Sequence, residues 1–382
     1  MLGGQPGSTR FLAAVALVLS ACAGSATPAQ APPSAAGAAP TAAPAEAATR
    51  EAASAAPAQL TVVRGGQVAA VAYPYYIGIE RGYYQEQGID LQFETFRAGA
   101  DMVPMIASGQ LDVSQQAVVP STFNAVLRGV PMKAILDASR SSPGQQSHAV
   151  LVRKELWDSG VIRTLPDLVG RRVATSSTPG GLMIDVDRGM RQYGRRIEET
   201  EQVQLPFPDM PAALANGSID VAVAVEPAIS TALNQNAAVV LGWLSEYYPE
   251  HQIAVQVIGP SMVERPDLTR RFVLAYLRGV RDWNDAAVHG VGVEELAQLL
   301  SPYNRLSPEV NATLLRRRGL TSIDPDGRIN KESMAYDMNW YVERGHLERP
   351  IDLDQFVDHQ YVDWAVAQLG PYVPPQARGA AR

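Results

Sequence analysis

The chain contains almost no cysteine and no hydrophobic run long enough to cross a membrane. Its single cysteine among 382 residues is Cys22, so a thiolate metal site in the rest of the chain is excluded. The apolar run Phe11–Leu19 is too short for a bilayer and fits the hydrophobic region of a signal peptide. The formal net charge of −7 argues against a general electrostatic footprint for nucleic acid, so we expect no nucleic-acid partner.

The residues around Cys22 indicate targeting and a tether. Leu19-Ser20-Ala21-Cys22 resembles the lipobox of bacterial lipoproteins, in which cleavage leaves an N-terminal cysteine that carries lipid. We therefore expect residues 1–21 to be a lipoprotein signal peptide and Cys22 to be lipidated, with an ordinary cleavage site as the alternative. Residues 22–58 are mainly Ala, Pro, Ser, Gly and Thr, which bury too little apolar area to fold, so we expect a flexible tether.

Two stretches of the remaining chain resemble each other. Residues 102–119 and 210–227 each contain a short helical pattern, a glycine and then Leu-Asp-Val or Ile-Asp-Val, so that Asp112 falls on Asp220. A helix that stops at a glycine and is followed by an apolar strand is an αβ unit, and such units build a mostly parallel sheet. The repeat therefore predicts two similar α/β lobes, although the pattern is also common punctuation between a helix and a strand.

The order of predicted strands and helices places the boundaries of the two lobes. The chain should cross to the second lobe near Ser141–Gln146 and return through the strand near Ile253–Ile258. We assign residues 59–146 and 257–370 to the first lobe with its C-terminal helices, 147–256 to the second lobe, and 371–382 to a loose tail. The helix that begins near Pro266 should bury one face. The residues on that face are Leu268, Phe272, Ala275, Tyr276, Gly279 and Trp283.

The sequence offers few candidates for catalysis. Its five histidines show no zinc-protease spacing, and neither a Gly-x-Ser-x-Gly nucleophile motif nor a phosphate-binding P-loop occurs. Ser147 and His148 are neighbours, but adjacency does not make a catalytic pair, and His148 could be structural or a ligand contact. Asp112 and Asp220 lie at αβ turns, where a carboxylate usually accepts backbone N–H groups. We therefore expect no enzyme activity, no metal and no cofactor.

Four polar or aromatic segments follow predicted strands, and ligands of open α/β sheets bind outside the carboxyl ends of the strands. Tyr73–Tyr76 offers aromatic faces and hydroxyls, Ser114–Gln116 offers amides, and Ser139–Ser142 offers one cation among hydroxyls. Ser176–Gly181 offers hydroxyls and free N–H groups at a predicted helix start, which suits an anion or a carbonyl. Each segment could be an ordinary turn, but together they predict a polar and aromatic cleft.

Four motifs in a fixed order resemble those of a known family. They are ERGYYQEQGIDL at 80–91, ASGQLDV at 107–113, LVGRRVA at 168–174, and ALANGSIDV at 213–221 followed by Val225-Glu226-Pro227. The set is similar to the periplasmic-type solute-binding proteins of ABC importers, specifically the group for nitrate, sulfonates, taurine and thiamine-pyrimidine precursors. The resemblance covers residues 60–367. The cysteine-rich motif of the fungal pyrimidine synthases with this fold is absent, which disfavours that enzymatic branch.

The resemblance implies the α/β fold of type II periplasmic binding proteins, in which two αβ lobes joined by two crossover segments close on a solute in the cleft between them. It also implies a permease in the membrane as partner and a place at the cell envelope, facing the periplasm or the exterior. We further expect a monomer. Glu226 is equally open to a structural role. The cleft residues carried over by position are Tyr73, Tyr75, Tyr76, Gln116, Ser139, Thr178, Gly180, Gly181 and Glu226.

The solute should be a small organic compound. The tyrosines and amides favour a sulfonate, an aromatic acid or a pyrimidine-like compound over bare nitrate. Two alternatives stay open: an enzyme on the same scaffold that forms a pyrimidine or hydrolyses its substrate, and a binding lipoprotein that serves a sensor.

Overall fold

A computed structural model describes residues 60–68, 73–96, 99–176 and 179–378. The predicted signal peptide, the tether with Cys22, and Thr178 lie outside these residues. All described residues belong to one unit of the chain, residues 56–382. No helix in the described ranges combines the length and the apolar character that crossing a membrane requires.

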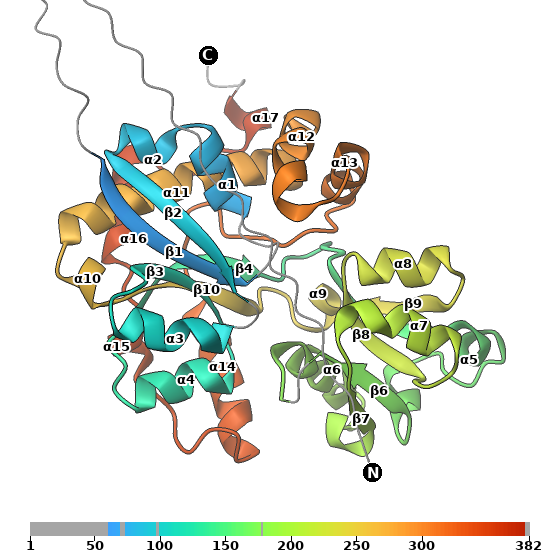
Figure 1. Ribbon diagram of the computed structural model, residues 1–382. Helices are drawn as coiled ribbons and strands as arrows, with labels where there is room; N and C mark the ends of the chain where they lie inside the picture. Colours follow the sequence, from blue (N-terminus) through green and yellow to red (C-terminus); the bar gives the residue numbers. More distant parts are fainter. Residues whose placement is uncertain (1–59, 69–72, 97–98, 177–178, 379–382) are drawn as a thin grey trace, which may run out of the picture. The chain divides into compact units, whose positions relative to one another are not determined.

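The first sheet is built around the repeat that contains Asp112. Its strand order is β2-β1-β3-β10-β4 (Figure 1). β1 runs parallel to β2 and β3, whereas β10 runs antiparallel to β3 and β4. The strands are β1 Thr61–Val68, β2 Ile89–Phe96, β3 Val113–Ala117, β4 Lys133–Arg140 and β10 Gln252–Ile258.

The second sheet repeats this arrangement around Asp220. Its strand order is β7-β6-β8-β5-β9, with β6 parallel to β7 and β8 and with β5 antiparallel to β8 and β9. In each sheet the antiparallel strand is the one that follows a crossover between the sheets, which confirms the predicted pair of αβ lobes. The strands are β5 His148–Arg153, β6 Arg172–Thr175, β7 Glu201–Gln204, β8 Val221–Val225 and β9 Ala238–Trp243.

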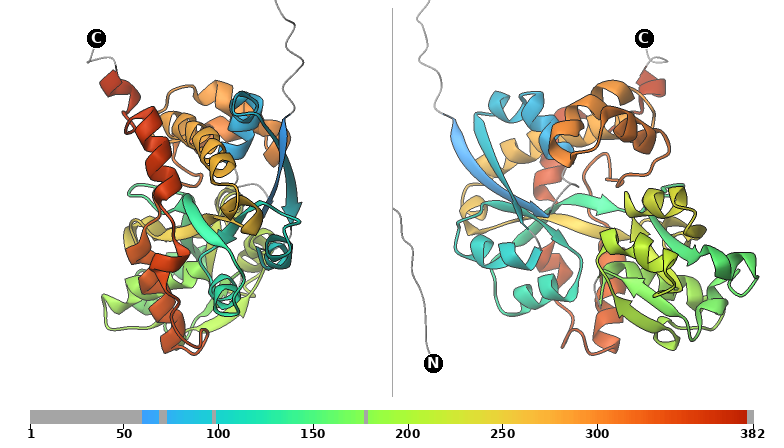
Figure 2. Two further views of the ribbon diagram at one scale, coloured as in Figure 1. Left: turned by 90° about the vertical axis from the view of Figure 1, so that its left-hand side faces the viewer. Right: turned by 45° about the vertical axis from the view of Figure 1, so that its right-hand side comes forward.

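Helices connect and cover the strands of both sheets (Figures 1 and 2). Those between the strands of the second sheet, and after its last strand, are α5 Lys154–Asp158, α6 Gly181–Arg191, α7 Met210–Ala215, α8 Ala228–Asn234 and α9 Leu244–Tyr247. The others are α1 Tyr73–Glu80, α2 Tyr83–Glu86, α3 Gly99–Ala107, α4 Pro120–Leu127, α10 Pro260–Val263, α11 Pro266–Ala287, α12 Val293–Asn304, α13 Pro308–Arg316, α14 Lys331–Glu343, α15 Leu353–Phe356, α16 Gln360–Leu369 and α17 Pro375–Arg378.

The long helix α11 is the main support of the first sheet's helical layer. The prediction that it buries one face is confirmed, since all six expected residues are buried. α11 crosses α1 at Gly279, where a Cβ atom would lie 2.4 Å from the carbonyl oxygen of Pro74. Only glycine allows so close a backbone approach. The helix that carries the predicted site tyrosines is thereby fixed against the core of this lobe.

The start of the first sheet differs from the expectation. The residue pair Gly65-Gly66 predicts a turn from its residue types alone, but β1 runs through both glycines without interruption. A Cβ atom at Gly65 would lie 2.2 Å from the ring of Phe93 on the neighbouring strand. The strand needs glycine here because large side chains of its neighbours pack directly against the backbone. In the sequence alone, a glycine with this role looks the same as a glycine in a turn.

The two lobes are joined by more than the predicted crossovers. The two crossover segments are hydrogen-bonded to each other, because Ser141 of the first donates its N–H to the carbonyl of His251 of the second at 2.9 Å. α14, which we expected in the first lobe, also binds the second lobe, because the indole N–H of Trp340 donates to Asp187 at 2.8 Å. β10, which the predicted boundary at residue 256 divides, pairs along its length with strands of the first sheet.

The C-terminal tail was expected to be loose, and its described part, residues 371–378, makes specific contacts with α11. It includes α17, and Tyr372 donates its hydroxyl to Asp285 of α11 at 2.7 Å. Arg378 forms an ion pair with the same carboxylate at 2.8 Å. The prolines of this segment indicate that its regular structure is short, but they say nothing about its contacts. The ion pair and the hydrogen bond to Asp285 hold the segment in place.

Candidate functional site

The N-terminus of α6 supplies free backbone donors near a strand end. β6 ends at Thr175, and α6 begins at Gly181 after Gly180 in extended conformation, with no side-chain cap. The first N–H groups of a helix have no partner within it and carry a partial positive charge. A cavity of about 30 Å³, about the size of one water molecule, adjoins this helix start. It is lined by Thr175, Ser176, Gly180, Gly181, Leu182, Met183 and Val223.

The start of α4 in the first lobe lies close to this cavity. A Cβ atom at Gly181 would lie 4.0 Å from the carbonyl oxygen of Val118, which precedes Pro120 at the first position of α4. Tyr341 of α14 donates its hydroxyl to the same carbonyl at 3.4 Å. The segment that precedes α4 in the first lobe therefore lies against the start of α6 in the second lobe. The free N–H groups at the start of α6 suit the binding of an anionic or carbonyl group.

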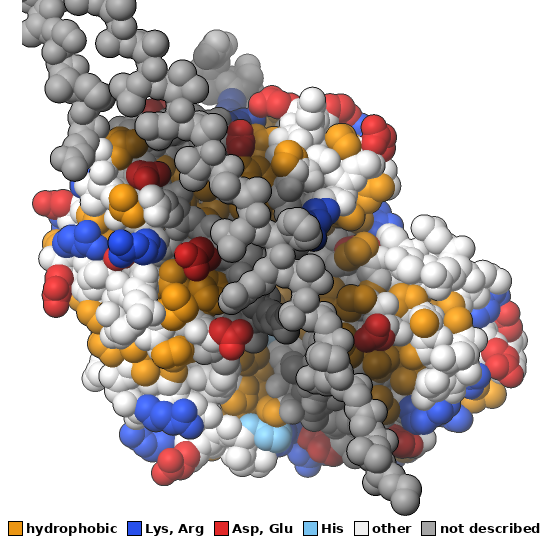
Figure 3. Space-filling model, in the orientation of Figure 1, with side chains coloured by type: hydrophobic (Ala, Val, Ile, Leu, Met, Phe, Trp, Pro, Cys, Tyr) orange, Lys and Arg blue, Asp and Glu red, His pale blue; other side chains and the backbone are white. Residues whose placement is uncertain are grey.

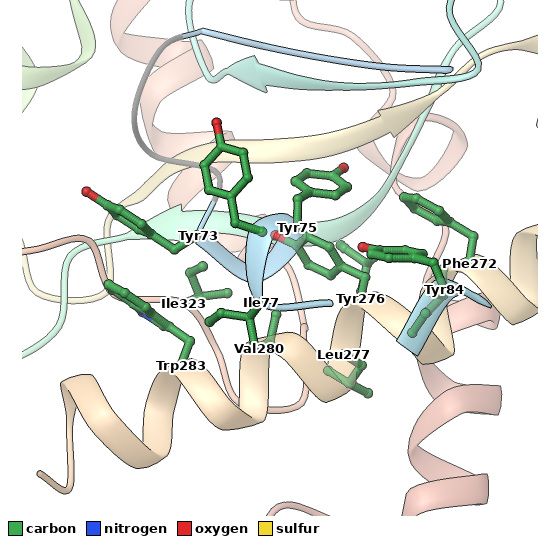
Figure 4. Close-up of a cluster of buried hydrophobic side chains, with 14 of the residues drawn as sticks. Tyr73, Tyr75, Ile77, Tyr84, Phe272, Tyr276, Leu277, Val280, Trp283 and Ile323 are labelled. Atoms are coloured by element: carbon green, nitrogen blue, oxygen red, sulfur yellow. The ribbon is translucent and has the colours of Figure 1, made fainter. Parts of the chain in front are cut away.

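The three predicted site tyrosines lie in α1, not in the loop that we expected. Figure 4 shows Tyr73 and Tyr75 among the buried side chains around them. Tyr73 stacks on Trp283 with ring centroids 4.5 Å apart. Tyr75 has no exposed surface and donates its hydroxyl to Gln256 at 2.7 Å. Tyr76 stacks on Tyr303 at 4.0 Å. Tyr75 is therefore a packing residue of the hydrophobic core in this structure, and the other two rings are buried against aromatic neighbours.

Burial also sets the protonation of these tyrosines. It raises the pKa of Tyr73, Tyr75 and Tyr76 above the ordinary value, in Tyr76 against a hydrogen bond from Gln67 that lowers it. The hydroxyls remain neutral and can only donate or accept hydrogen bonds near neutral pH.

Gln116 and Ser139, the next two predicted residues, are buried and internally bonded. The Gln116 amide donates to the carbonyl of Gly99 at 3.2 Å and to the Ser114 hydroxyl at 3.0 Å. The Ser139 hydroxyl lies 2.5 Å from that of Thr321. Both residues lie within strands, because β3 and β4 extend further than the sequence indicated.

Glu226 is held by two partners in this structure. Its carboxylate accepts a hydrogen bond from the guanidinium of Arg317 and another from the backbone N–H of Ser230 at 3.2 Å. The side chain of Glu226 is 4% exposed in this pair. Since Arg317 directly follows α13, the carboxylate ties the end of β8 to a helix that packs with α11 and α12.

Ser147 and His148, weighed above as a possible catalytic pair, are hydrogen-bonded at 2.6 Å. Burial, together with the charge of His251, lowers the pKa of His148 to about 4. Ser147 also accepts a hydrogen bond from the Gln145 amide at 2.6 Å. No carboxylate orients this imidazole in the bonds that the described residues form, and within those residues no group of His, Cys, Asp and Glu could hold a metal ion.

The structure thus brings Gly180 and Gly181 together with Thr175 and Ser176, but it divides the remaining predicted residues. Thr178 lies outside the described residues. The sequence analysis missed Gln67, whose buried amide donates to Tyr76 and, at 3.4 Å, to Thr95. The repeat could have indicated it, because Gln67 and Thr175 are each three positions beyond the arginines that pair with Asp112 and Asp220.

A larger hollow lies away from these groups. It has a volume of about 690 Å³ and adjoins Lys133 at the start of β4 and Pro260 after the end of β10. That edge of the first sheet is opposite to the carboxyl ends of β1, β3 and β4. On the face drawn in Figure 3, acidic and basic side chains are interspersed and do not gather into one basic patch.

The fold defined by these two sheets is that of periplasmic solute-binding proteins. The crystal structure of the periplasmic aliphatic sulphonate binding protein SsuA from Escherichia coli superposes with a TM-score of 0.63, at 19% identity, over 78% of this chain and 92% of that one. The chain belongs to the family described as NMT1/THI5 like, which matches residues 70–286.

Relatives in this family include both binding proteins and enzymes. The Bacillus subtilis protein named "Putative aliphatic sulfonates-binding protein" is 23% identical over 81% of this chain and 90% of its own length. The Saccharomyces cerevisiae 4-amino-5-hydroxymethyl-2-methylpyrimidine phosphate synthase THI12 is 23% identical over 44% of this chain. The chain spans slightly less than half of the synthase, 46% of its length.

Proposed function

We propose that this protein is the extracytoplasmic solute-binding component of an ABC importer for a small organic solute with an anionic group. The observation that carries the proposal is the start of α6, which has no side-chain cap and lies beside the cavity at Gly180 and Gly181. Backbone N–H groups at a helix start favour negative charge. The names of the sulfonate-binding relatives favour a sulfonate or a carboxylic acid among the possible anions.

The proposal extends to how the protein is held and what it meets. Cys22 would carry lipid and anchor the protein to a membrane, and residues 22–58 would tether the two lobes within the cell envelope, facing the periplasm or the exterior. The partner would be a membrane permease that receives the solute, and the protein would act as a monomer without a cofactor.

A thermal-shift screen with native mass spectrometry tests the proposal. The panel contains alkanesulfonates, aromatic carboxylic and sulfonic acids, and pyrimidines, each offered to the purified residues 59–382. A solute present at a hundredfold excess over its Kd stabilises by about 2.7 kcal/mol, which is well within detection. If no member stabilises the protein and no solute is retained through purification, the proposed function is wrong.

The second candidate is an enzyme on the same scaffold, and the match to the yeast synthase favours it. Its candidate catalytic residues are Ser147 and His148, whose Oγ and Nδ1 atoms are hydrogen-bonded at 2.6 Å. Mass spectrometry of each solute after incubation with the protein separates the two functions, because a binding protein returns the solute unaltered and an enzyme does not. A third, a binding lipoprotein that serves a sensor, is separated by whether permease and ATPase genes adjoin its own.

A further inference from the structure

A row of polar side chains crosses the first sheet near the carboxyl ends of its parallel strands. Gln67 on β1 is in register with Thr95 on β2, and Gln115 on β3 is in register with Gln256 on β10. β1 and β3 pair at Gly65 with Val113 and at Gly66 with Ser114, so the next pair is Gln67 with Gln115. Side chains in register lie on the same face of a sheet. Three glutamines therefore stand side by side across β1, β3 and β10.

Two of these glutamines have a buried oxygen without a partner. Gln67 is 1% exposed and Gln115 is 6% exposed. The Oε1 atom of each has no hydrogen-bond partner among the described residues. The Gln67 amide is oriented by its Nε2, which donates to the hydroxyls of Tyr76 and Thr95. An unpaired buried acceptor is costly, and two neighbouring ones in a row call for a donor that the described residues do not provide.

The third glutamine shows the ordinary arrangement in the same row. Gln256 is as buried as Gln67, and both ends of its amide are used. Its Oε1 accepts from the Tyr75 hydroxyl at 2.7 Å, and its Nε2 donates to the Tyr276 hydroxyl at 3.2 Å. The row is therefore satisfied at β10 and unsatisfied at β1 and β3, the two adjacent parallel strands whose carboxyl ends are the usual place for a ligand in such sheets.

We infer that Gln67 and Gln115 form an acceptor subsite that takes an N–H or O–H donor of the bound solute, such as an amine, an amide or an aminopyrimidine. The inference rests on the proposed function and narrows its solute class. The helix start of α6 would take the acidic group, and the two amide oxygens would take the donor. A solute with both groups would be preferred over one with the acidic group alone.

Matched solutes and matched variants test the subsite. The solute pairs are taurine with ethanesulfonate and 4-aminobenzenesulfonate with benzenesulfonate, which differ by one amino group, together with the best stabiliser from the screen and its analogue without the donor. We expect the donor-bearing member to bind about tenfold more tightly, as one hydrogen bond to a buried acceptor allows. Calorimetric titration of the protein gives the ratio within each pair.

The variants are Gln67→Met, Gln115→Met and the control Gln256→Met. We expect the first two to abolish the preference within the pair. Gln115→Met should leave the melting temperature of the free protein unchanged, because it removes an unpaired oxygen. Gln67→Met should lower it, because the Gln67 Nε2 donates to Tyr76 and Thr95. The control should lower the melting temperature and keep the preference, because its amide is bonded to two tyrosines. A best-bound solute without a donor, or a preference that survives in both test variants, overturns the subsite while leaving the proposed function intact. Absence of binding by every solute overturns both.

Discussion

The two lobes use the same turn chemistry at the same places. In the first, the Arg64 N–H donates to the Asp112 carboxylate at 2.9 Å and the Asp112 N–H donates to the Arg64 carbonyl at 2.8 Å. In the second, Arg172 and Asp220 form the same two bonds at 3.1 and 3.0 Å. The aspartates thus join the first and third strands of each parallel set, a structural role that the sequence pattern predicts.

The lobes differ in what they present beyond these turns. Thr175 and Val223 occupy in the second sheet the places that Gln67 and Gln115 occupy in the first, since each lies three positions after the paired arginine or aspartate. The second lobe therefore offers backbone N–H groups at α6 beside a small apolar wall, and the first offers side-chain amides. The two lobes can therefore present different chemical groups on the same framework. Backbone pairing determines the framework, but it does not determine which side chains occupy these positions.

The strongest departure from the repeat is the joint between the lobes. His251 lies in the second crossover, is 1% exposed, and bonds Asp185 of α6 at 3.0 Å and Asp337 of α14 at 2.8 Å. Replacement by glutamine, His251→Gln, removes the positive charge between two buried carboxylates. We expect a loss of about 3–5 kcal/mol in the free energy of unfolding, measured by chemical denaturation.

The exposed His346 provides the control for that change. His346→Gln should alter the free energy of unfolding by less than about 0.5 kcal/mol, as surface substitutions usually do. If the loss in free energy of unfolding for His251→Gln is as small as that for His346→Gln, the carboxyl groups of Asp185 and Asp337 become neutral when the imidazole is removed. The lobes would then be held together by packing.

The same joint predicts how stability depends on pH. Burial would lower the pKa of His251, but the carboxylates of Asp185 and Asp337 outweigh it and raise the pKa to about 10. A raised pKa gives a contribution that is complete below the unfolded value of about 6.5 and is lost as pH rises through about 10. Between these values the stability should fall by about 1.4 kcal/mol per pH unit.

The comparison with His251→Gln isolates this titration from other groups. Tyr248 stacks on His251, Arg188 lies over Tyr248, and His148 interacts with His251 electrostatically, so all three contribute to the background. The difference in free energy of unfolding between the natural protein and the variant should shrink from pH 6.5 to 10. A difference that is constant over this range would contradict the charged state of His251.

The sequence predicts the framework well because backbone periodicity and turn residues determine it. The Gly-x-Leu-Asp-Val repeat indicates both lobes, and the apolar spacing of α11 indicates its buried face. The site is harder to predict, since a tyrosine that packs and a tyrosine that binds look alike in a sequence. Tyr75 is the clear case, because its burial depends on α11 and Gln256, which lie about two hundred residues further along.

The polar residues at strand ends show the same limit. Ser114, Gln115 and Gln116 suggested that a loop begins after Ser114, whereas β3 continues to Ala117. Polar residues within a strand disfavour it locally, but pairing with β10 on one side and β1 on the other satisfies the backbone. Which face each glutamine lies on, and which amide oxygen is left unpaired, follows only from that register.

The two turn aspartates allow the repeat itself to be tested. Asp220 accepts bonds from the Arg172 guanidinium at 2.8 Å and from Arg153 at 3.3 Å, while Asp112 accepts from Ser261 at 2.5 Å and from Arg265 at 3.0 Å. We expect Asp220→Asn and Asp112→Asn each to lose about 1–3 kcal/mol, as for hydrogen bonds to charged groups. Urea unfolding measures both. Equal losses would support equal roles, and a loss in only one would show that the repeat is one of sequence alone.

The smallest expected difference concerns the glycines that end the two repeat helices. Gly109 and Gly217 have φ angles of 73° and 75°, a conformation that costs an L-residue about 1–2 kcal/mol. Alanine at Gly109 would meet nothing within 4 Å, whereas at Gly217 its Cβ would lie 2.9 Å from an Arg153 nitrogen. Both alanine variants should therefore lose about 1 kcal/mol in thermal unfolding, with Gly217→Ala slightly worse because Arg153 must move.

Asparagine tolerates this conformation better than alanine, so Gly109→Asn should lose less stability than Gly109→Ala in the same thermal unfolding experiment. If the two substitutions cost the same, backbone conformation is not what these glycines provide.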